Sequence, residues 1–569
     1  MIRAARTFAR VTLLAALTAA TSAHAQPPPT PSEPVAMAIA TELESLMSPE
    51  PAPIHGVHVA FQERIQSFYA RRAFRPAWSS AKNASQLRRA LADSVADGLD
   101  PADYVLELLT RLGRENEGPA ATSVMRAQHD ILHTEALLRL AYHLSFGKVD
   151  AESFDAQWNY GRTLAHRDVE REVEAALAAE DIYGRIEALK PNHRMYVGLK
   201  RELARYRAAA GAAEPAAIPA GPALKPGAGD PRVGLLRARL VMSGDLAPAD
   251  AAESAVYDAP LEDAVRRFQA RMGLESDGIA GPGTVAELNV PLAERIRQLR
   301  VNLDRGRVLL QDLPEKFVVV NIAGYTAYVV KGQDIVWSAR VQVGKPYRKT
   351  PLFRSEINYL VFNPTWTVPP GIIAADILPA AKRDPASITR KGLKVLDGKG
   401  HEVDPASVDW SRYSGGHIPY TLRQEPGPKN ALGRVKLMFP NPYFVYLHDT
   451  PSQALFDRAE RAFSSGCVRV ERALELAAIV LDEPQAWNAG SIDAVIGGGK
   501  LQNVTLKTKV PVLITYWTAW VDADGRMNFR RDLYGQDARW AAALDAPFKV
   551  RAKPLFEADF SPETGARGR

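Results

Sequence analysis

The sequence has very little cysteine, since Cys467 is the only one in 569 residues. A chain with one thiol cannot form an internal disulfide, so a fold that depends on disulfides is excluded. Beyond the first 25 residues there is also no run of about 18 apolar residues, which argues against a membrane-spanning helix in the rest of the chain. A single free thiol is easier to explain by chemistry than by packing.

An excess of charge of one sign is missing as well. The chain has 71 Lys and Arg residues against 65 Asp and Glu residues, a formal net charge of +6. Such an even balance does not indicate nucleic acid as a partner, and it fits an anionic polymer only loosely. The length and the 46% of hydrophobic residues predict about two to four domains with cores of their own.

The first 25 residues have the pattern of a cleavable secretory signal. Arg3, Arg6 and Arg10 precede an apolar run at 11–20, and the small residues of A-H-A at 23–25 suit a cleavage site. The apolar run is too short to span a membrane. The pattern predicts export, with the Gram-negative periplasm as the expected location, and a soluble mature protein whose net charge is +6 − 3 = +3.

The segment from Val445 to Arg472 contains Cys467 and also His448, a residue type that can take a proton from a thiol. The alternating aromatic residues that lead up to His448 predict a strand. Apolar residues from Val468 onward recur at helical spacing, so we expect Cys467 just before a helix N-terminus. The positive end of a helix lowers the pKa of a thiol, which would favour a reactive thiolate.

These residues suit nucleophilic catalysis. The Cys467 thiolate would attack a carbonyl while His448 takes the proton and later returns it to a leaving amine. Backbone N–H groups of Ser465, Gly466 and Cys467 are expected to bind the oxyanion, and Gly466 lets a substrate approach the main chain. In the alternative interpretation Cys467 is simply a small buried residue, but the S-G-C turn favours chemistry.

The residues S-S-G-C-V-R at 464–469, together with His448, resemble the signature of L,D-transpeptidases with a YkuD-type catalytic domain. That signature has a His followed by S-H-G-C-x-R/N. Here Ser465 stands where a second His is often found, so His448 is the one candidate base. The resemblance implies that the main-chain carbonyl of Asp449 orients the imidazole.

Two neighbouring residues have expected roles that stay open. Tyr446 shares a strand face with His448, so it would position the substrate or the base, or only pack. Arg469 is expected to brace the turn by bonding to backbone carbonyls, and the alternative is contact with a substrate carboxylate.

The resemblance implies L,D-transpeptidation of peptidoglycan without a cofactor or metal. Cys467 would attack the carbonyl of the third-position diamino acid in a tetrapeptide stem and release the terminal D-Ala. An amine of a neighbouring stem would then resolve the thioester into a 3–3 cross-link, and susceptibility to carbapenems is implied as well. Two alternatives remain: an L,D-carboxypeptidase or cysteine peptidase that uses water as acceptor, and a non-catalytic peptidoglycan-binding protein.

The N-terminal half of the chain reads as helical after a Pro-rich tether at 26–53. Amphipathic runs such as those at 68–78 and 137–150 are broken at Gly and Pro, and they resemble the scaffold domain of large L,D-transpeptidases. His129 and His133 have the spacing of zinc ligands on a helix, but the Glu of H-E-x-x-H and a third ligand are missing. We therefore expect no metal at this pair.

An Ala-, Gly- and Pro-rich stretch at 208–231 predicts a linker. The residues after it resemble the three-helix peptidoglycan-binding domain. Those that match its motif explain the fold better than they explain contact with stem peptides or glycan, so the wall-contacting residues stay open. The matching residues are Phe268, Gln269, Gly273, Leu274, Asp277, Gly278, Gly281, Thr284 and Leu288.

Beyond residue 317 the apolar period changes from helical to alternating. A hairpin with its turn at Lys331-Gly332 and further short strands predict a mainly β sandwich or barrel. The long Gly- and Pro-rich insertion at about 371–428 is expected to be a lid over the cleft, with a disordered loop as the alternative. A second hairpin is predicted at the D-G turn of Asp524-Gly525, which lacks the distal Glu of a calcium loop.

The sequence thus predicts a multidomain α+β protein with a helical N-terminal scaffold, a three-helix peptidoglycan-binding module and a mainly β catalytic domain with a lid insertion. It gives no indication of protein partners. The expected divisions are a signal peptide at 1–25, a helical scaffold domain at 26–207, a linker at 208–231, a peptidoglycan-binding domain at 232–290, a connecting helix at 291–316, a catalytic domain at 317–500 with the lid at about 371–428, and a C-terminal β hairpin and tail at 501–569.

Overall fold

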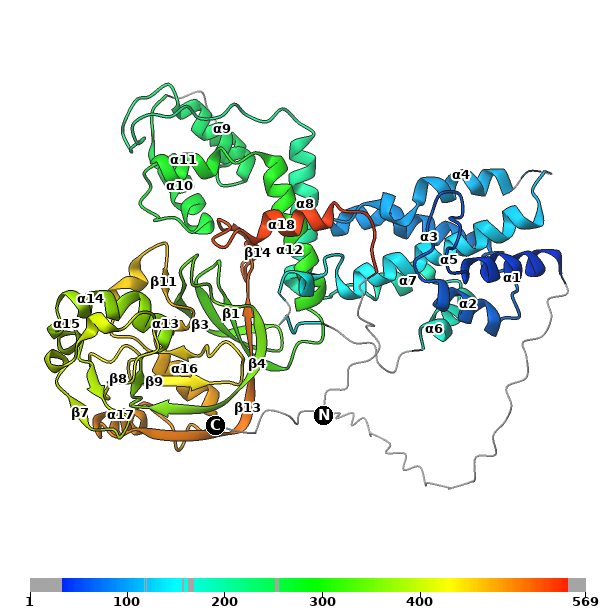
Figure 1. Cartoon of the computed structure of the whole chain (residues 1–569). Coiled ribbons are helices and arrows are strands. Elements are labelled where there is room, and N and C mark those ends of the chain that lie inside the picture. Colours follow the sequence, from blue (N-terminus) through cyan, green and yellow to red (C-terminus); the bar gives the residue numbers. More distant parts are fainter. Residues whose placement is uncertain are drawn as a thin grey trace, which may run out of the picture.

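The computed structural model of this chain combines helical and β-rich regions, which confirms the predicted multidomain α+β class (Figure 1). The structure describes residues 33–116, 118, 120–155, 158–161, 168–250 and 255–550. The signal expected at 1–25 lies outside the described residues. So do the first residues of the Pro-rich tether and the last nineteen of the chain, 551–569.

The N-terminal region is a bundle of helices around one long central helix, α5 (Ser123–Phe146). The side chain of Thr122 caps α5 by accepting a hydrogen bond from the N–H of Met125. Apolar side chains on nearly all sides of α5 are buried, so the helix forms the core of this region. The other helices of the bundle are α1 (Pro34–Leu46), α2 (Gln62–Arg71), α3 (Ala81–Asp93), α4 (Leu106–Asn116), α6 (Val169–Ala178) and α7 (Ile182–Glu187). The next helix, α8 (Arg194–Ala210), stands apart from α5, and its buried side chains belong to the core of the three-helix module.

The histidine pair of α5 belongs to this core. His133 is fully buried, and its Nδ1 lies 2.9 Å from the carbonyl oxygen of His129. Burial lowers the pKa of His133 to about 3, so its imidazole is neutral at physiological pH. Asp130, between the two, accepts hydrogen bonds from Tyr69 and from the backbone of Trp78. These contacts give the segment a structural role in the helix bundle.

The three-helix module consists of α9 (Val233–Ser243), α10 (Ala259–Met272) and α11 (Pro282–Leu288). Its motif residues hold the fold together: Gln269 donates to Asp277 Oδ1 at 2.8 Å and accepts from the N–H of Gly278 at 2.9 Å. Part of the predicted linker at 208–231 packs onto the module, since Leu224 is buried and forms a β-bridge with Ala280. This part of the stretch is thus ordered against the module.

The helix α12 (Leu292–Leu309) is the junction between the regions, as Figure 1 shows at the centre of the molecule. Asp304 is fully buried on it and pairs with Arg307 at 2.7 Å. Asp304 also accepts from the N–H of Lys148 in the N-terminal region at 2.7 Å and from Trp540 near the C-terminus at 2.9 Å. A buried carboxylate with this many partners ties two distant parts of the chain to one helix.

A nine-stranded mixed sheet forms the centre of the C-terminal half, in the order β11-β3-β12-β10-β9-β4-β13-β1-β2. The strand β2 also pairs with β3, so the sheet closes on itself around an apolar core. A mainly β sandwich or barrel was predicted, and the structure has the barrel; the hairpin turn at Lys331-Gly332 is confirmed too. The strands are β1 (Lys316–Asn321), β2 (Thr326–Lys331), β3 (Asp334–Gly344), β4 (Phe353–Phe362), β9 (Val435–Met438), β10 (Leu447–His448), β11 (Ala462–Ser464), β12 (Val468–Val470) and β13 (Gln502–Thr515).

The expected end of the catalytic domain at residue 500 is wrong. The strand β13 begins at Gln502 and lies inside the sheet, parallel to β1 and antiparallel to β4. Val512 and Ile514 of this strand are fully buried in the barrel core. A boundary at 500 would therefore remove a strand from the middle of the sheet. The sequence alone did not show this, because the strands that pair with β13 are far from it along the chain.

The insertion between β4 and β9 is a folded subdomain rather than a disordered loop. It has a four-stranded sheet and an apolar core that includes Ile388, Val395 and Leu422. Its strands are β5 (Trp366–Thr367), β6 (Lys394–Leu396), β7 (Glu402–Val403) and β8 (Thr421–Gln424). Its helices are α13 (Pro370–Ile372), a π-helical turn (Ile373–Ile377), α14 (Leu378–Arg383) and α15 (Ala386–Arg390).

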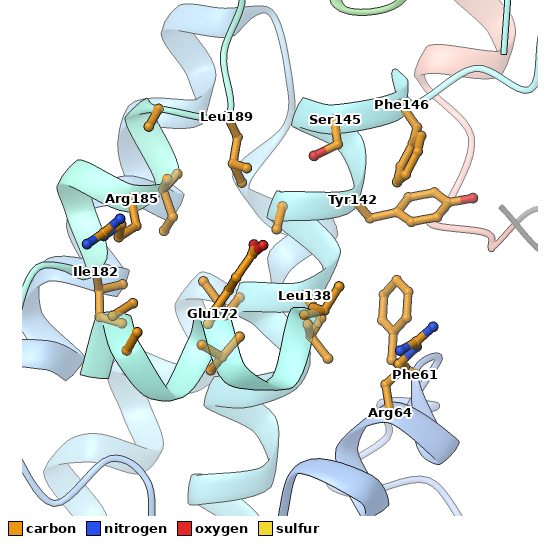
Figure 2. A pocket seen from close by; sticks show the side chains of 18 of the residues that line it. Phe61, Arg64, Leu138, Tyr142, Ser145, Phe146, Glu172, Ile182, Arg185 and Leu189 are labelled. Atoms are coloured by element: carbon orange, nitrogen blue, oxygen red, sulfur yellow. The ribbon is translucent and has the colours of Figure 1, made fainter. Parts of the chain in front are cut away.

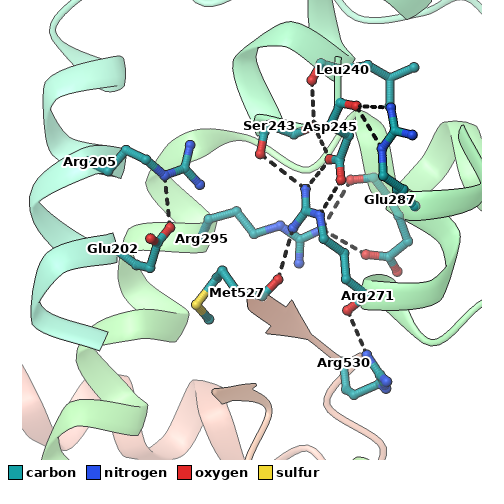
Figure 3. A network of polar contacts seen from close by, with 11 residues as sticks. Glu202, Arg205, Leu240, Ser243, Asp245, Arg271, Glu287, Arg295, Met527 and Arg530 are labelled. Carbon is teal, nitrogen blue, oxygen red and sulfur yellow. Dashed lines mark hydrogen bonds and ion pairs between the residues drawn. The ribbon is translucent and has the colours of Figure 1, made fainter. Parts of the chain in front are cut away.

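After β13 the chain leaves the barrel and returns to the helical regions. The predicted D-G hairpin is confirmed as β14 (Ala519–Val521) and β15 (Met527–Phe529), and it is followed by α18 (Gln536–Leu544). Arg271 of α10 donates to the carbonyl of Met527 and to Asp245, and Arg530 donates to the carbonyl of Arg271 (Figure 3). The hairpin is thus fixed to the three-helix module.

Candidate active site

Two adjacent parallel strands, β10 and β12, bring Cys467 and His448 to one face of the barrel wall. Leu447 pairs with Val468, and His448 pairs with Arg469. Leu447 and Val468 are fully buried in the barrel core. Side chains alternate along a strand, so Cys467 and His448 both point to the opposite face, on strands about 4.8 Å apart.

The expected helix behind Cys467 is wrong. Cys467 is followed by the strand β12, and the helix α16 (Ala473–Leu481) begins only at Ala473. Buried Val468 and Val470 flank half-buried Arg469, which is the period of a strand. The N-terminus of α16 is therefore separated from the thiol by a strand, and burial raises the pKa of Cys467 above its ordinary value. Hydrogen bonds from Tyr446 and the charges of Arg469 and Lys436 oppose that increase.

His448 is buried and held in one tautomer. Its Nδ1 lies 2.6 Å from the carbonyl oxygen of Asp449. A carbonyl can only accept, so Nδ1 carries the hydrogen and Nε2 has the free lone pair. Burial, with help from Arg469, lowers the pKa of His448 to about 3, so the imidazole is neutral at physiological pH. This leaves a neutral base with Nε2 as its proton acceptor.

Asp449 is fixed by its side chain as well as by the contact with His448. Its carboxylate pairs with Arg434 at 2.8 Å and accepts from the N–H of Arg434 at 3.0 Å. Gly433 has a φ of +63°, and a Cβ there would come within 2.6 Å of the Asp449 carboxylate. Only glycine fits this close approach. The carbonyl that holds His448 is therefore part of a rigid corner.

Tyr446 contacts both Cys467 and His448. Its ring packs against His448 with 5.5 Å between the ring centroids, and its hydroxyl is a hydrogen-bond partner of the Cys467 thiol. The Cys467 Sγ also donates to the carbonyl of Phe444 at 3.8 Å rather than to His448. Phe444 itself is exposed and has a φ of +57°, outside the strand in which it was expected. Tyr446 is thus placed to position the thiol and the imidazole together.

The turn before Cys467 depends on Gly466, whose φ of +120° is open only to glycine. The N–H of Gly466 donates to the Ser464 hydroxyl at 3.1 Å, and that hydroxyl donates to the carbonyl of Cys467 at 2.5 Å. Gly466 therefore cannot supply a free oxyanion donor as expected. The N–H groups of Ser465 and Cys467 remain as candidates for that role.

Two cations of the same sheet lie near the thiol, Arg469 on β12 and Lys436 on β9. Arg469 donates to the side chain of Gln342 at 3.1 Å, so the expected bracing through backbone carbonyls is replaced by a side-chain contact. Lys436 of β9 is the pairing partner of His448, and its ammonium lies 5.5 Å from the Tyr446 ring centroid. Both can stabilise negative charge that develops near Cys467. Lys436 was not predicted, because only strand pairing brings it to the site.

Thr350 and Tyr534 support the Gly466 turn and were not predicted either. The Thr350 hydroxyl donates to the carbonyl of Gly466 at 2.8 Å and accepts from the N–H of Gly344 at 2.9 Å. Tyr534 accepts from the N–H of Thr350 at 3.1 Å and donates to the carbonyl of Gly344 at 2.7 Å. All of these groups are buried, and no local sequence pattern links them.

The raised pKa of Cys467 leads to a prediction about its reactivity. Iodoacetamide reacts with the thiolate, so the alkylation rate should increase about tenfold per pH unit from pH 7 to beyond pH 9. Intact mass against time at each pH would give this rate for the single cysteine of the chain. A rate that is already constant between pH 6 and pH 8 would instead indicate a preformed thiolate.

A cavity of about 440 Å³ lies in the N-terminal helical region (Figure 2). Apolar side chains such as Leu138 and Ile182 line most of it, together with Glu172 and Arg185. None of its lining residues comes from the barrel or from the Cys467 site. In the described parts of the chain, no cluster of three or more His, Cys, Asp or Glu side chains could hold a metal, and no helix is long and apolar enough to cross a membrane.

Three family models match separate parts of the chain. The L,D-transpeptidase catalytic domain, YkuD, matches residues 315–512 and includes both Cys467 and His448. The scaffold domain matches residues 63–203. A domain described as "Putative peptidoglycan binding domain" matches residues 229–288. The chain therefore carries a YkuD-type L,D-transpeptidase catalytic domain preceded by a scaffold domain and a peptidoglycan-binding domain.

A curated protein of Haemophilus influenzae, named "Putative L,D-transpeptidase", is 37% identical over 243 residues, which is 42% of this chain and 48% of that protein. The match thus spans about half the length of the relative. An L,D-transpeptidase structure from Mycobacterium smegmatis has 14% identity and a TM-score of 0.18, over 35% of this chain and 58% of that chain. One from Xylanimonas cellulosilytica has 15% identity and a TM-score of 0.17, and the match covers 52% of this chain and 99% of that chain. TM-scores this low support no inference about the Cys467 site.

Proposed function

We propose that the protein is an L,D-transpeptidase that forms 3–3 cross-links in peptidoglycan through a thioester on Cys467. The observation that supports this most is the placement of Cys467 and His448 on one face of adjacent strands, inside the region that matches the catalytic domain. The neutral His448, with Nε2 as acceptor, suits a general base, and Cys467 suits the nucleophile.

In the first half-reaction, His448 Nε2 takes the thiol proton as Cys467 Sγ attacks the carbonyl carbon of the third-position diamino acid. The oxyanion would be held by the N–H groups of Ser465 and Cys467, with Lys436 and Arg469 adding positive charge. The C–N bond then breaks, and the departing D-Ala amine takes the proton from the imidazolium. The result is a thioester and neutral His448.

In the second half-reaction, a side-chain amine of a neighbouring stem attacks the thioester carbonyl. His448 removes a proton from that amine, the C–S bond breaks, and the proton goes to the Cys467 sulfur. The raised pKa of Cys467 and the lowered pKa of His448 both disfavour a preformed ion pair. Proton removal therefore accompanies attack rather than preceding it.

The other modules would bring the substrate to this site. The peptidoglycan-binding domain would hold the wall polymer, and the folded insertion between β4 and β9 would act as the lid of the cleft. Export by the signal at 1–25 would place the protein in the periplasm, where that polymer is found. A carbapenem would acylate Cys467 because its strained carbonyl meets the same nucleophile.

The test is to incubate the full chain with tetrapeptide stems and weigh the products. Two stems joined with loss of one D-Ala support the transpeptidase. Loss of D-Ala without joining would support the L,D-carboxypeptidase, in which water replaces the amine. No change in mass, together with retention on isolated wall sacculi, would favour the non-catalytic binding protein.

Thr350 provides a second prediction, which concerns the turn that carries the nucleophile. Thr350→Val keeps the volume but removes the bonds to Gly466 and Gly344, so the rate of Cys467 acylation should fall by about tenfold to a hundredfold. Thr350→Ser keeps the hydroxyl and is the matched control, expected to stay near wild type. The rate of D-Ala release measures both, and thermal unfolding checks that each variant is folded. Equal rates for the two variants would show that the hydroxyl is not needed.

A further inference from the structure

The guanidinium of Arg348 lies beside the turn that precedes Cys467, and the carboxylate of Asp376 in the insertion binds it. Arg348, in the loop between β3 and β4, pairs with Asp376 through two contacts of 2.6 and 3.2 Å. The same Arg348 donates to the Ser465 hydroxyl at 2.8 Å. Ser465 stands two residues before Cys467, so Arg348 brings a positive charge to the edge of the site.

The loop that carries Arg348 lies against the turn that precedes Cys467. The N–H of Lys345 donates to the carbonyl of Ser464 at 3.1 Å, and Thr350 at the other end of the loop donates to Gly466. The sequence of the loop, K-P-Y-R-K-T at 345–350, is basic. Its ends are thus fixed to the turn, while the Arg348 side chain keeps about a fifth of its surface exposed (21%).

Asp376 comes from an unusual backbone segment. It lies in the π-helical turn Ile373–Ile377 between α13 and α14, and such turns are rare and frequent at functional sites. Its side chain is 47% exposed, so the ion pair with Arg348 faces solvent. An exposed ion pair is weak, and another carboxylate with the same geometry can displace Asp376.

We propose that Arg348 binds the C-terminal carboxylate of the donor stem peptide, and that Asp376 occupies the position of that carboxylate in this structure. The inference rests on the proposed function, because that function supplies a peptide whose last residue ends in a carboxylate next to the scissile bond. A bidentate guanidinium–carboxylate pair fixes the orientation of a peptide end. Arg348 would thus select stems with a free terminal carboxylate and align the scissile carbonyl with Cys467.

The experiment compares two ligands on the full chain carrying Cys467→Ala, so that binding is measured without reaction. One ligand is the tetrapeptide stem with a free C-terminal acid, and the other is its C-terminal amide. By calorimetric titration we expect the acid to bind about ten- to a hundredfold more tightly than the amide. Adding Arg348→Met should abolish this preference, whereas Arg348→Lys should keep only part of it.

Asp376→Asn, in the same background, tests the competing carboxylate. It should tighten binding of the acid by severalfold and leave binding of the amide unchanged, because only the acid competes with Asp376 for Arg348. Equal affinities for acid and amide, or no binding of either, would overturn the proposal. A preference for the acid that survives Arg348→Met would overturn it too.

The outcomes are separable from those that bear on the proposed function. If the Cys467-containing chain releases D-Ala while the Cys467→Ala chain binds acid and amide equally, only the role of Arg348 fails. If the chain prefers the acid through Arg348 but never releases D-Ala, the transpeptidase proposal fails and the binding site stands. Thermal unfolding of each variant confirms that the insertion keeps its fold.

Discussion

Replacing Cys467 with serine is expected to lower the rate of D-Ala release by at least about a thousandfold. A serine hydroxyl is a far weaker acid than a thiol, and the neutral His448, whose pKa is about 3, is a weak base for it. The substitution is small and the turn is held by Gly466 and Thr350, so the fold should persist. Release of D-Ala from tetrapeptide stems, followed by mass, measures the effect.

The control for Cys467→Ser is the covalent adduct of the wild-type chain. A carbapenem should add its mass once to the wild-type chain and not at all to the serine variant within the same time. Because the chain has no other cysteine, the adduct needs no further assignment among thiols. A serine variant that joins stems at the wild-type rate would eliminate the thioester mechanism.

Replacing His448 with glutamine should lower the rate by about a hundredfold to ten-thousandfold. Glutamine can still donate to the Asp449 carbonyl but cannot accept the thiol proton and return it. In the wild-type protein, His448 becomes protonated only as the pH falls toward its pKa of about 3. We therefore expect protonation of His448 to cause little loss of rate between pH 7 and pH 5. Initial rates of D-Ala release across this range provide the comparison.

The pH profile of His448→Gln separates a chemical role from a structural one. Without a base, attack depends on the thiolate that solvent generates, so the residual rate should rise about tenfold per pH unit up to the raised pKa of Cys467. His448→Asn is the matched variant, because its shorter amide lacks the base function as well. A residual rate that does not change with pH would mean that His448 acts only through packing.

The candidate pair, Cys467 and His448, was predictable because its signal is local. A single cysteine in an S-G-C turn and one histidine upstream mark the site without any knowledge of the fold. The two hairpins were predictable for the same reason, since Lys331-Gly332 and Asp524-Gly525 are turn sequences between alternating runs. The period of these strands predicted a sandwich or a barrel, and only the pairing of β2 with β3 decides for the barrel.

The helix predicted behind Cys467 shows where a periodic pattern misleads. The strand β12 is only three residues long, and its Val468 and Val470 join without a break to the apolar positions of α16, which begins at Ala473. A short strand followed by a helix then reads as one longer helix. The consequence was an expected thiolate, whereas burial gives a thiol with a raised pKa.

The remaining site residues could not be found from the sequence, because each reaches the site through contacts between distant segments. Lys436 arrives by antiparallel pairing with His448, and Thr350 by a hydrogen bond to Gly466. Tyr534 comes from beyond the last catalytic strand, and Arg348 from a loop more than a hundred positions before Ser465. A single sequence contains no pattern that links such pairs.

The position of β13 has a consequence for how the protein acquires its activity. This strand lies between β1 and β4, yet its residues, Gln502–Thr515, are synthesised after those of the other eight strands of the sheet. Before they arrive, the edges of β1 and β4 that face it have no partner, and the barrel cannot close. Contacts this far apart in the chain form slowly. The proposed reaction therefore requires the whole sheet, and a polypeptide truncated before residue 502 should be unable to cut or join a stem peptide.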